Sequence, residues 1–584
     1  MQEVFLWRSP RSPINLNLNY ERNNDMKQDN NQNAVLTDAD VRLAVETLER
    51  YRAGKSRLDS RICEEAAWWR DRHGGRVPAG STKQGVKPVS AWLFSSICNK
   101  HADLCDAKPV CSVLPRDPDD EAEAALLSDI LPVIAERCGF DATYDRNTWS
   151  KLKHGMAAYG VFWNPTLQNG VGDVDITRVD VMNLFWEPDV GNIQESPNLF
   201  LVGLCDTDTL LARYPHLKDK RAAMRDDGTF FTPDMGGSYL SGNEGMGDKT
   251  AVVDWYYKRV SPTGKTVLHY AKFTGDILLY ASENDPDYAE GGWYDHGMYP
   301  VVLDVLYPDE GSASGYGLIA VGRNPQGYID ELDGHILEYA NAASRVRYWA
   351  KRSLGVNEKE FLDPDRRIIE VEGDIDEEKL RQITLSPMDG MLGDVRRMKI
   401  DELKETTGNR DVSQGSTTGG VTAAQAIEAL QEAGNKGSRD MTAGSYRAYT
   451  EIMRQVIELL RQFYDGVRCF RIADRDGGRR YVRYSNTGLQ DKTTGVGCDG
   501  DTLYRHPTFD VEVRAEQDTP LDRAGRNELL LELYRAGIFD PSNREAALGV
   551  LAGMEFEGVE ALRAYLGRES VWKSSDKLGE ETCP

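Results

Sequence analysis

The stretch that decides the fold is Asn324–Gly355, which reads NPQGYIDELDGHILEYANAASRVRYWAKRSLG. Its apolar residues recur at helical spacing and predict one stripe made of Ile329, Leu332, Ile336, Tyr339, Ala343 and Val346. Asn324 is a good cap, Pro325 suits a first helical position, and Gly355 suits the residue after a helix. The stretch therefore predicts a helix over 324–354, a rod of roughly 45 Å at 1.5 Å per residue.

The segments that follow this helix have an unusual order. Residues 356–390 read as a small strand-rich insert, and a second helix follows and ends near Gly408. Next comes SQGSTTGG at 413–420, a loop without large side chains. A long helix is then expected over 422–465, with a kink at its internal glycines.

The rest of the chain alternates between helical and strand-rich regions. Helical periodicity and end signals predict helices over 37–73, 89–106, 119–138 and 141–160. Turn-separated alternation predicts strands within 161–190, 251–281 and 301–309, and again at 467–473, 479–485 and 508–515. Further helices are expected over 521–536 and 543–566. The fold class is therefore α+β.

Length, charge and cysteine content limit the possible functions. The 584 residues allow two to four domains, and no apolar run approaches the roughly 20 residues that a bilayer requires. The net charge of -24 argues against a protein that grips DNA through many phosphate contacts. Nine scattered cysteines favour a reduced protein, and the Asn-rich residues 1–25 suggest a disordered extension.

Two short patterns resemble enzyme signatures, and both fail on context. Thr263-Gly264-Lys265-Thr266 looks like the end of a phosphate-binding loop, but the upstream glycine is missing and a strand follows, so a hairpin turn is favoured. The run Gly311–Gly315 carries Ala313 where a nucleophile would stand. We expect neither a catalytic constellation nor a cofactor.

A group of cysteines and one histidine raises the question of zinc. On one helix Cys98, His101 and Cys105 would share a face, and Cys111 lies close by in sequence. No Cys-x-x-Cys pair occurs, and small buried cysteines are common in cores. The interpretation favoured here is a structural role without metal.

The long helix carries a basic cluster near its predicted end, formed by Arg345, Arg347, Lys351 and Arg352. Cations at this end complement the helix dipole and are ordinarily solvated. The alternative is a surface that contacts phosphates or a docking partner. Both interpretations remain open at this point.

Four segments of the sequence carry a resemblance to a known family, namely residues 100–117, 151–190, 327–434 and 509–538. In this order they resemble the portal proteins of tailed double-stranded DNA bacteriophages, over about residues 37–540. The resemblance is specific because of the order of the segments: a helix, a strand-rich insert, a second helix, a Gly/Thr loop and a long kinked helix. None of these segments is a catalytic signature.

The resemblance implies a portal fold with an α/β wing, a helical stem, a β-rich clip, a long kinked helix and a helical crown. The implied divisions are an extension at 1–25, the wing at 26–320, stem helices at 321–355 and 391–412, the clip at 356–390, a tunnel loop at 413–421, the long helix at 422–465, wing strands at 466–515, and the crown and tail at 516–584.

The resemblance also implies a function that is not enzymatic. Portals form a homo-dodecameric ring at one capsid vertex, through which double-stranded DNA is packaged and ejected without sequence reading. The implied partners are the terminase large subunit, neck, adaptor or tail proteins, and the major capsid and scaffold proteins, with no membrane. The implied location is the virion, and the host cytoplasm during assembly.

Site residues follow from the same resemblance. The tunnel loop would line the DNA channel through Ser413, Gln414, Gly415, Ser416, Thr417, Thr418, Gly419 and Gly420. The clip would dock partners through Arg366, Arg367, Glu370 and Glu372. An ordinary flexible connector is the alternative for the loop.

Two other functions compete with the portal interpretation. A packaging enzyme, a terminase-like ATPase or nuclease, requires a phosphate-binding loop or an acidic metal cluster at strand ends, and the phosphate-binding loop is absent. Another virion structural or head–tail connector protein remains an alternative, but such proteins would not require the stem, insert, stem order. The number of subunits and nucleotide hydrolysis are the properties that distinguish the three.

Overall fold

The computed structural model describes the chain in segments: 35–73, 89–106, 108–218, 249–260, 266–344, 347–350, 380–383, 388, 390–409, 436–473, 479–496, 502–515, 520–535, 550–551 and 553–554. Helices and strands are mixed along these segments, which confirms the α+β class. Among the described helices, none is both long enough and apolar enough to cross a bilayer.

A five-stranded antiparallel sheet forms one part of the body, in the order β4-β5-β6-β7-β8. Its strands are β4 (Leu184–Trp186), β5 (Asn198–Asp206), β6 (Lys249–Val260), β7 (Thr266–Thr274) and β8 (Ile277–Ala281). Helix α2 (Asp38–His73) packs its apolar stripe on this sheet, with Tyr51 against Phe200. In register, Val260 lies opposite Thr266, so the hairpin predicted in place of a phosphate-binding loop is confirmed.

A second antiparallel sheet lies at the centre of the largest core, in the order β3-β2-β9. It consists of β2 (Met156–Asn164), β3 (Asp173–Val179) and β9 (Val301–Val305). Every residue of β2 is buried. Core residues of helices α4 (Glu121–Arg137), α5 (Phe140–His154) and α12 (Lys436–Phe463) belong to the same cluster.

The helix expected over 141–160 is shorter in the structure, since α5 ends at His154. Gly155 adopts a left-handed conformation with φ 88°, which stops the helix, and its amide donates to the carbonyl of Lys151. The next residues enter β2 because both neighbouring strands are present to pair with them. The expectation of helix up to Gly160 was therefore wrong.

Strands from the two ends of the body pair directly. β1 (Pro109–Pro115) is antiparallel to β18 (Phe509–Ala515), with Val113 opposite Val511. The strands predicted at 467–473, 479–485 and 508–515 are confirmed as β14 (Arg468–Ala473), β15 (Arg479–Tyr484) and β18. β1 was not predicted, since its partner lies about 400 residues away. Other elements of the described residues are β16 (Lys492–Val496), β17 (Thr502–Arg505), β10 (Tyr307–Pro308), β11 (Gly315–Tyr316), α6 (Leu167–Gly170), α7 (Thr207–Arg213) and α13 (Pro520–Arg535).

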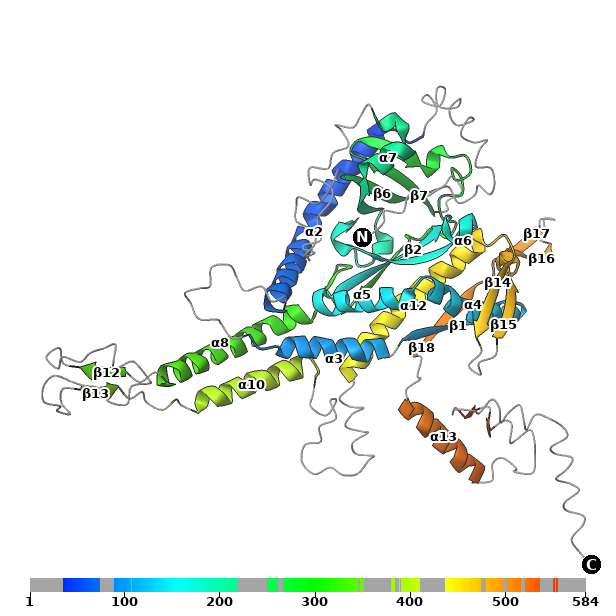
Figure 1. Cartoon of the computed structure of the whole chain (residues 1–584). Coiled ribbons are helices and arrows are strands. Elements are labelled where there is room, and N and C mark those ends of the chain that lie inside the picture. Colours follow the sequence, from blue (N-terminus) through cyan, green and yellow to red (C-terminus); the bar gives the residue numbers. More distant parts are fainter. Residues whose placement is uncertain are drawn as a thin grey trace, which may run out of the picture.

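Two helices project from this body side by side, α8 (Leu318–Ser344) and α10 (Met391–Thr406) (Figure 1). A short antiparallel pair, β12 (Arg347–Ala350) and β13 (Leu380–Ile383), lies at their far end. Helix α3 (Trp92–Asp106) runs along the base of the pair. This projection is the most distinctive feature of the molecule.

The structure corrects the boundaries predicted for the first of these helices. α8 begins at Leu318, so Pro325 lies inside the helix, and it ends at Ser344 rather than at 354. Buried Leu318 and Ile319 hold the extra first turn against the body. The run Arg347–Ala350 instead pairs with 380–383, because its aromatic residues favour a strand once a partner strand is present.

Candidate functional site

The projecting helix pair and its base form the candidate functional site. The base of α8 is fixed to the body by a polar cluster around Asp330. One oxygen of this carboxylate accepts from the Ser90 amide (3.1 Å) and the Ser90 hydroxyl (2.9 Å), and Arg72 forms an ion pair with the other. Gln326, which is 1% exposed, accepts from the Leu93 amide at 3.0 Å. These bonds hold α8 at the start of α3.

The two projecting helices contact each other through a small apolar cluster. Ile329 of α8 packs with Ile400 and Leu403 of α10, and Trp92 covers them. Further along, Arg396 of α10 forms an ion pair with Asp333 of α8. The helices therefore form a braced pair.

Lys100 of α3 joins the base of α10 to the start of α12. Its ammonium donates to the carbonyl of Gly408 (2.9 Å) and to the hydroxyl of Ser438 (2.8 Å), and it is 2% exposed. Burial lowers the pKa of Lys100, and the nearby carboxylate of Asp103 opposes that shift. α3 thus holds α8, α10 and α12 together, so the helix pair leaves the body from a rigid base.

Most of the residues that the sequence nominated lie outside the described residues. This holds for the tunnel loop at 413–420, for Arg366, Arg367, Glu370 and Glu372, and for Arg345, Lys351 and Arg352. Arg347 is described through its backbone, and it stands in β12 opposite Ile383. Arg347 therefore lies in a strand and not in the last turn of a helix as predicted, and both interpretations of the cluster stay open.

The structure brings His101 and Cys105 together with Asp145 of α5, which sequence reasoning did not include. The ligand atoms of these three residues lie within 4.8 Å of one another. His101 and Cys105 are four residues apart on α3, a spacing that predicted their common face. Cys98 and Cys111 do not join this group, and Cys111 is buried in the main core. Nothing in the local pattern around Asp145 could have signalled its place.

Three of the described thiols are poorly suited to nucleophilic chemistry. Burial raises the pKa of Cys105 and Cys111 to about 11 and that of Cys138 to about 12. A thiolate is the reactive form, so Cys111 and Cys138 stay protonated and unreactive near neutral pH. Cys105 would have to release its proton on binding a metal ion, as any thiol ligand does.

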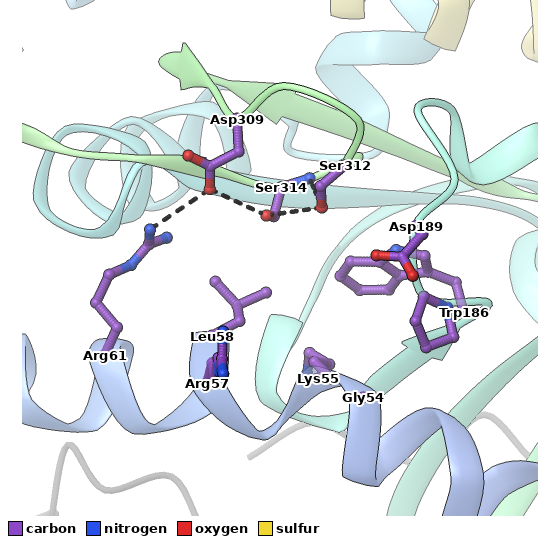
Figure 2. A pocket seen from close by; sticks show the side chains of 11 residues that line it. Gly54, Lys55, Arg57, Leu58, Arg61, Trp186, Asp189, Asp309, Ser312 and Ser314 are labelled. Atoms are coloured by element: carbon purple, nitrogen blue, oxygen red, sulfur yellow. Dashed lines mark hydrogen bonds and ion pairs between the residues drawn. The ribbon is translucent and has the colours of Figure 1, made fainter.

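A pocket of about 330 Å³ lies between α2 and the loops around Pro188 and Asp309 (Figure 2). Arg61 approaches Asp309 to 3.7 Å, and the hydroxyl of Ser314 donates to the same carboxylate at 3.4 Å. Lys55 turns away, since its buried ammonium donates to the carbonyl of Met182 at 3.2 Å and pairs with Asp59 at 2.9 Å. These contacts join α2 to the body and point to no particular ligand.

Comparison with known families tests the resemblance. A family model described as Phage P22-like portal protein matches residues 343–582, a range that includes α10, α12 and β14 to β18. No curated protein matches the chain.

The family that matches this region is one of structural virion proteins rather than of enzymes. Over residues 343–582 the chain is similar to the phage portal proteins, and this match supports the resemblance that its sequence carries.

Proposed function

We propose that this chain is the subunit of a dodecameric ring at one capsid vertex, the channel through which viral DNA enters and leaves. The observation that carries the proposal is the braced pair α8 and α10, which projects from an α+β body. Of the two helices, α10 lies inside the region of the family match, and the match begins where α8 ends. Helices of this length can pack side by side around an axis and leave a bore.

The surface of the helix pair supports a role in assembly. Large apolar side chains point to solvent in the single chain, with Tyr328 55%, Leu337 49% and Met398 63% exposed. Exposed apolar patches commonly mark protein interfaces, and these three side chains would contribute to one on the helix pair. In a ring, each helix pair would cover such residues with the neighbouring pair through a repeating heterologous contact.

The charge of the chain suits a channel for DNA. The net charge is -24, and DNA carries one negative charge per roughly 1.7 Å of its axis. A strongly basic bore would retain the polymer, whereas a subunit in which acidic residues outnumber basic ones, 94 to 70, lets it slide. The small residues of the tunnel loop at 413–420 agree with this requirement.

The far end of the helix pair is the proposed docking platform. There, β12 precedes the proposed clip at 356–390 and β13 lies within it, and the clip contains Arg366, Arg367, Glu370 and Glu372. In the proposed assignment this clip contacts the terminase motor during packaging and the neck or tail proteins afterwards. Residues 26–320 with 466–515 would be the wing, and residues 516–584 the crown and tail.

Particle imaging combined with mass photometry of the purified chain tests the proposal. We expect a ring with a central hole and twelve subunits. Leu337→Glu should reduce assembly while the subunit stays folded, whereas Val260→Glu, at a site 72% exposed on β6, should leave assembly unchanged. A chain that stays monomeric even with its scaffold protein, or a ring unaffected by Leu337→Glu, would contradict the proposed assembly or its interface, respectively.

A further inference from the structure

Three donor atoms from α3 and α5 face one point on the surface of the body. Nε2 of His101 lies 3.2 Å from Oδ1 of Asp145 and 3.5 Å from Sγ of Cys105. The distance from Sγ of Cys105 to Oδ1 of Asp145 is 3.9 Å. One imidazole, one thiol and one carboxylate therefore form a small triangle.

The size of this triangle fits a tetrahedral zinc ion. Zinc binds nitrogen and carboxylate oxygen at about 2.0–2.2 Å and thiolate sulfur at about 2.3 Å. Tetrahedral angles then place the donor atoms about 3.3 to 3.6 Å apart. Two of the three observed distances agree within about 0.1 Å, and the third is about 0.3 Å longer. Asp145, whose side chain is 53% exposed, has the freedom to shorten it.

The surroundings hold two of the donors in place. His101 and Cys105 stand on consecutive turns of α3, and the ring of His101 stacks on that of Trp149 at 4.2 Å between centroids. The His101 side chain is 13% exposed, so one side of the triangle is sheltered. The exposed Asp145 leaves the other side open to water, as a fourth ligand requires.

We propose that His101, Cys105 and Asp145 bind one Zn²⁺ ion per subunit, with water as the fourth ligand. Imidazole and thiolate together select zinc over magnesium or calcium, which prefer sets of oxygen ligands. The ion would join α3 to α5. Since α3 also holds α8, α10 and α12 through Lys100 and the Asp330 cluster, the site would strengthen the base of the projecting helices.

The proposal is tested on untagged full-length protein that has been dialysed against chelator and then titrated with Co²⁺ and Zn²⁺. Cobalt bound to a thiolate gives a charge-transfer absorption in the near ultraviolet, which reports the sulfur ligand directly. We expect one equivalent of Co²⁺ to produce this band, Zn²⁺ to displace it, and Zn²⁺ to raise the unfolding temperature.

Matched variants locate the site. Cys105→Ser should abolish the cobalt band, and Asp145→Asn, at an exposed position, should weaken Zn²⁺ binding at least about tenfold. Cys98→Ser on the same face of α3 should change neither property. Asp141→Asn on α5, where the carboxylate is exposed and pairs with Lys108, serves as the carboxylate control.

Two results would overturn the inference. The first is a chain that binds no stoichiometric Zn²⁺ or Co²⁺, in which case the triangle is a hydrogen-bonded His–Cys–Asp group alone. The second is a cobalt band that survives in Cys105→Ser, which would assign the metal to another cysteine. Because Asp145→Asn changes an exposed side chain, loss of folding would not confuse its result.

Discussion

Lys151 is the most fully buried cation described in the body, and its charge is compensated by a complete set of partners. Its ammonium lies 2.6 Å from the carboxylate of Asp304 and donates to the Ser445 hydroxyl at 2.7 Å and the Met441 carbonyl at 3.1 Å. The Lys151 side chain is 0% exposed. These bonds join α5, β9 and α12, the elements around the central sheet.

Replacing Lys151 by Met is expected to lower the free energy of unfolding by about 3–5 kcal/mol, because it leaves the Asp304 carboxylate buried without its counter-ion. Chemical denaturation followed by circular dichroism measures the loss. The double variant Lys151→Met/Asp304→Asn removes both charges and should recover a large part of the stability. A single variant as stable as the wild type would show that the pair contributes nothing to folding.

His269 predicts a pH dependence of stability. Its side chain is 6% exposed, and burial, followed by the charge of Arg259, lowers its pKa to about 4. The unfolded chain protonates this histidine near pH 6.5, before the folded chain does. Its contribution to stability is therefore complete above pH 6.5 and is lost as the pH falls towards 4, at up to about 1.4 kcal/mol per pH unit.

Unfolding measured between pH 7 and pH 4 for the wild type and for His269→Gln separates this effect from other titrations. Burial raises the pKa of the neighbouring Glu283, an effect of opposite sign that both proteins share. The variant should lose less stability on acidification than the wild type. Parallel curves would exclude His269 as a source of the dependence.

The ends of helix α5 show how single glycines define an element. Gly139 at its start and Gly155 at its end both have positive φ, 64° and 88°. A Cβ added at Gly139 would meet no atom within 4 Å, whereas one at Gly155 would lie 2.1 Å from the Tyr316 carbonyl carbon. The second glycine therefore serves close packing as well as helix termination.

The two alanine variants should differ for this reason. Gly139→Ala carries the conformational cost alone, about 1–2 kcal/mol. Gly155→Ala adds a backbone clash and should cost clearly more, with faster hydrogen exchange at the Leu306 amide, which donates to the Gly155 carbonyl. Equal losses in the two variants would mean that the approach of Tyr316 to Gly155 does not contribute.

The tunnel loop is proposed to act on DNA in the finished ring and not to contribute to ring assembly. Deleting residues 415–420 should leave ring formation intact and impair DNA packaging or retention, as measured by protected DNA per particle. A variant with these six residues in scrambled order keeps their small, uncharged character and should package normally. Failure of the deletion variant to form rings would contradict the assignment of this segment as a channel loop.

The basic cluster of Arg345, Arg347, Lys351 and Arg352 makes a separate prediction for the whole assembly. If these cations contact phosphates, replacing them by Gln should weaken the salt dependence of DNA binding by the ring. The slope of the logarithm of the binding constant against the logarithm of the salt concentration should change by up to about 0.9 per lost contact. Replacing exposed Arg471 and Arg483 of the body by Gln is the control. An unchanged slope and packaging rate would make the cluster an ordinary solvated surface.

Local patterns predicted most elements of the fold. The stripe from Ile329 to Ala343 marked the projecting helix, and the alternation on both sides of residues 261–265 marked a hairpin, since each pattern repeats with the period of its own backbone. The order of the segments indicates a resemblance to the portal family, which the family match over residues 343–582 supports. These features depend on neighbours close in the chain, which is why they can be read from it.

Contacts between residues far apart in the sequence determined the remaining features of the fold and of the candidate sites. The chain changes from helix α5 to strand β2 at Gly155 because β9 pairs with β2. The helix α8 ends at Ser344, and the next described residues form β12, which pairs with β13. Val113 of β1 lies opposite Val511 of β18. The same holds for the candidate sites, where Asp145 joins His101 and Cys105, and Lys100 joins Gly408 to Ser438. Contacts between residues so far apart in sequence arise from packing, and no local spacing encodes them.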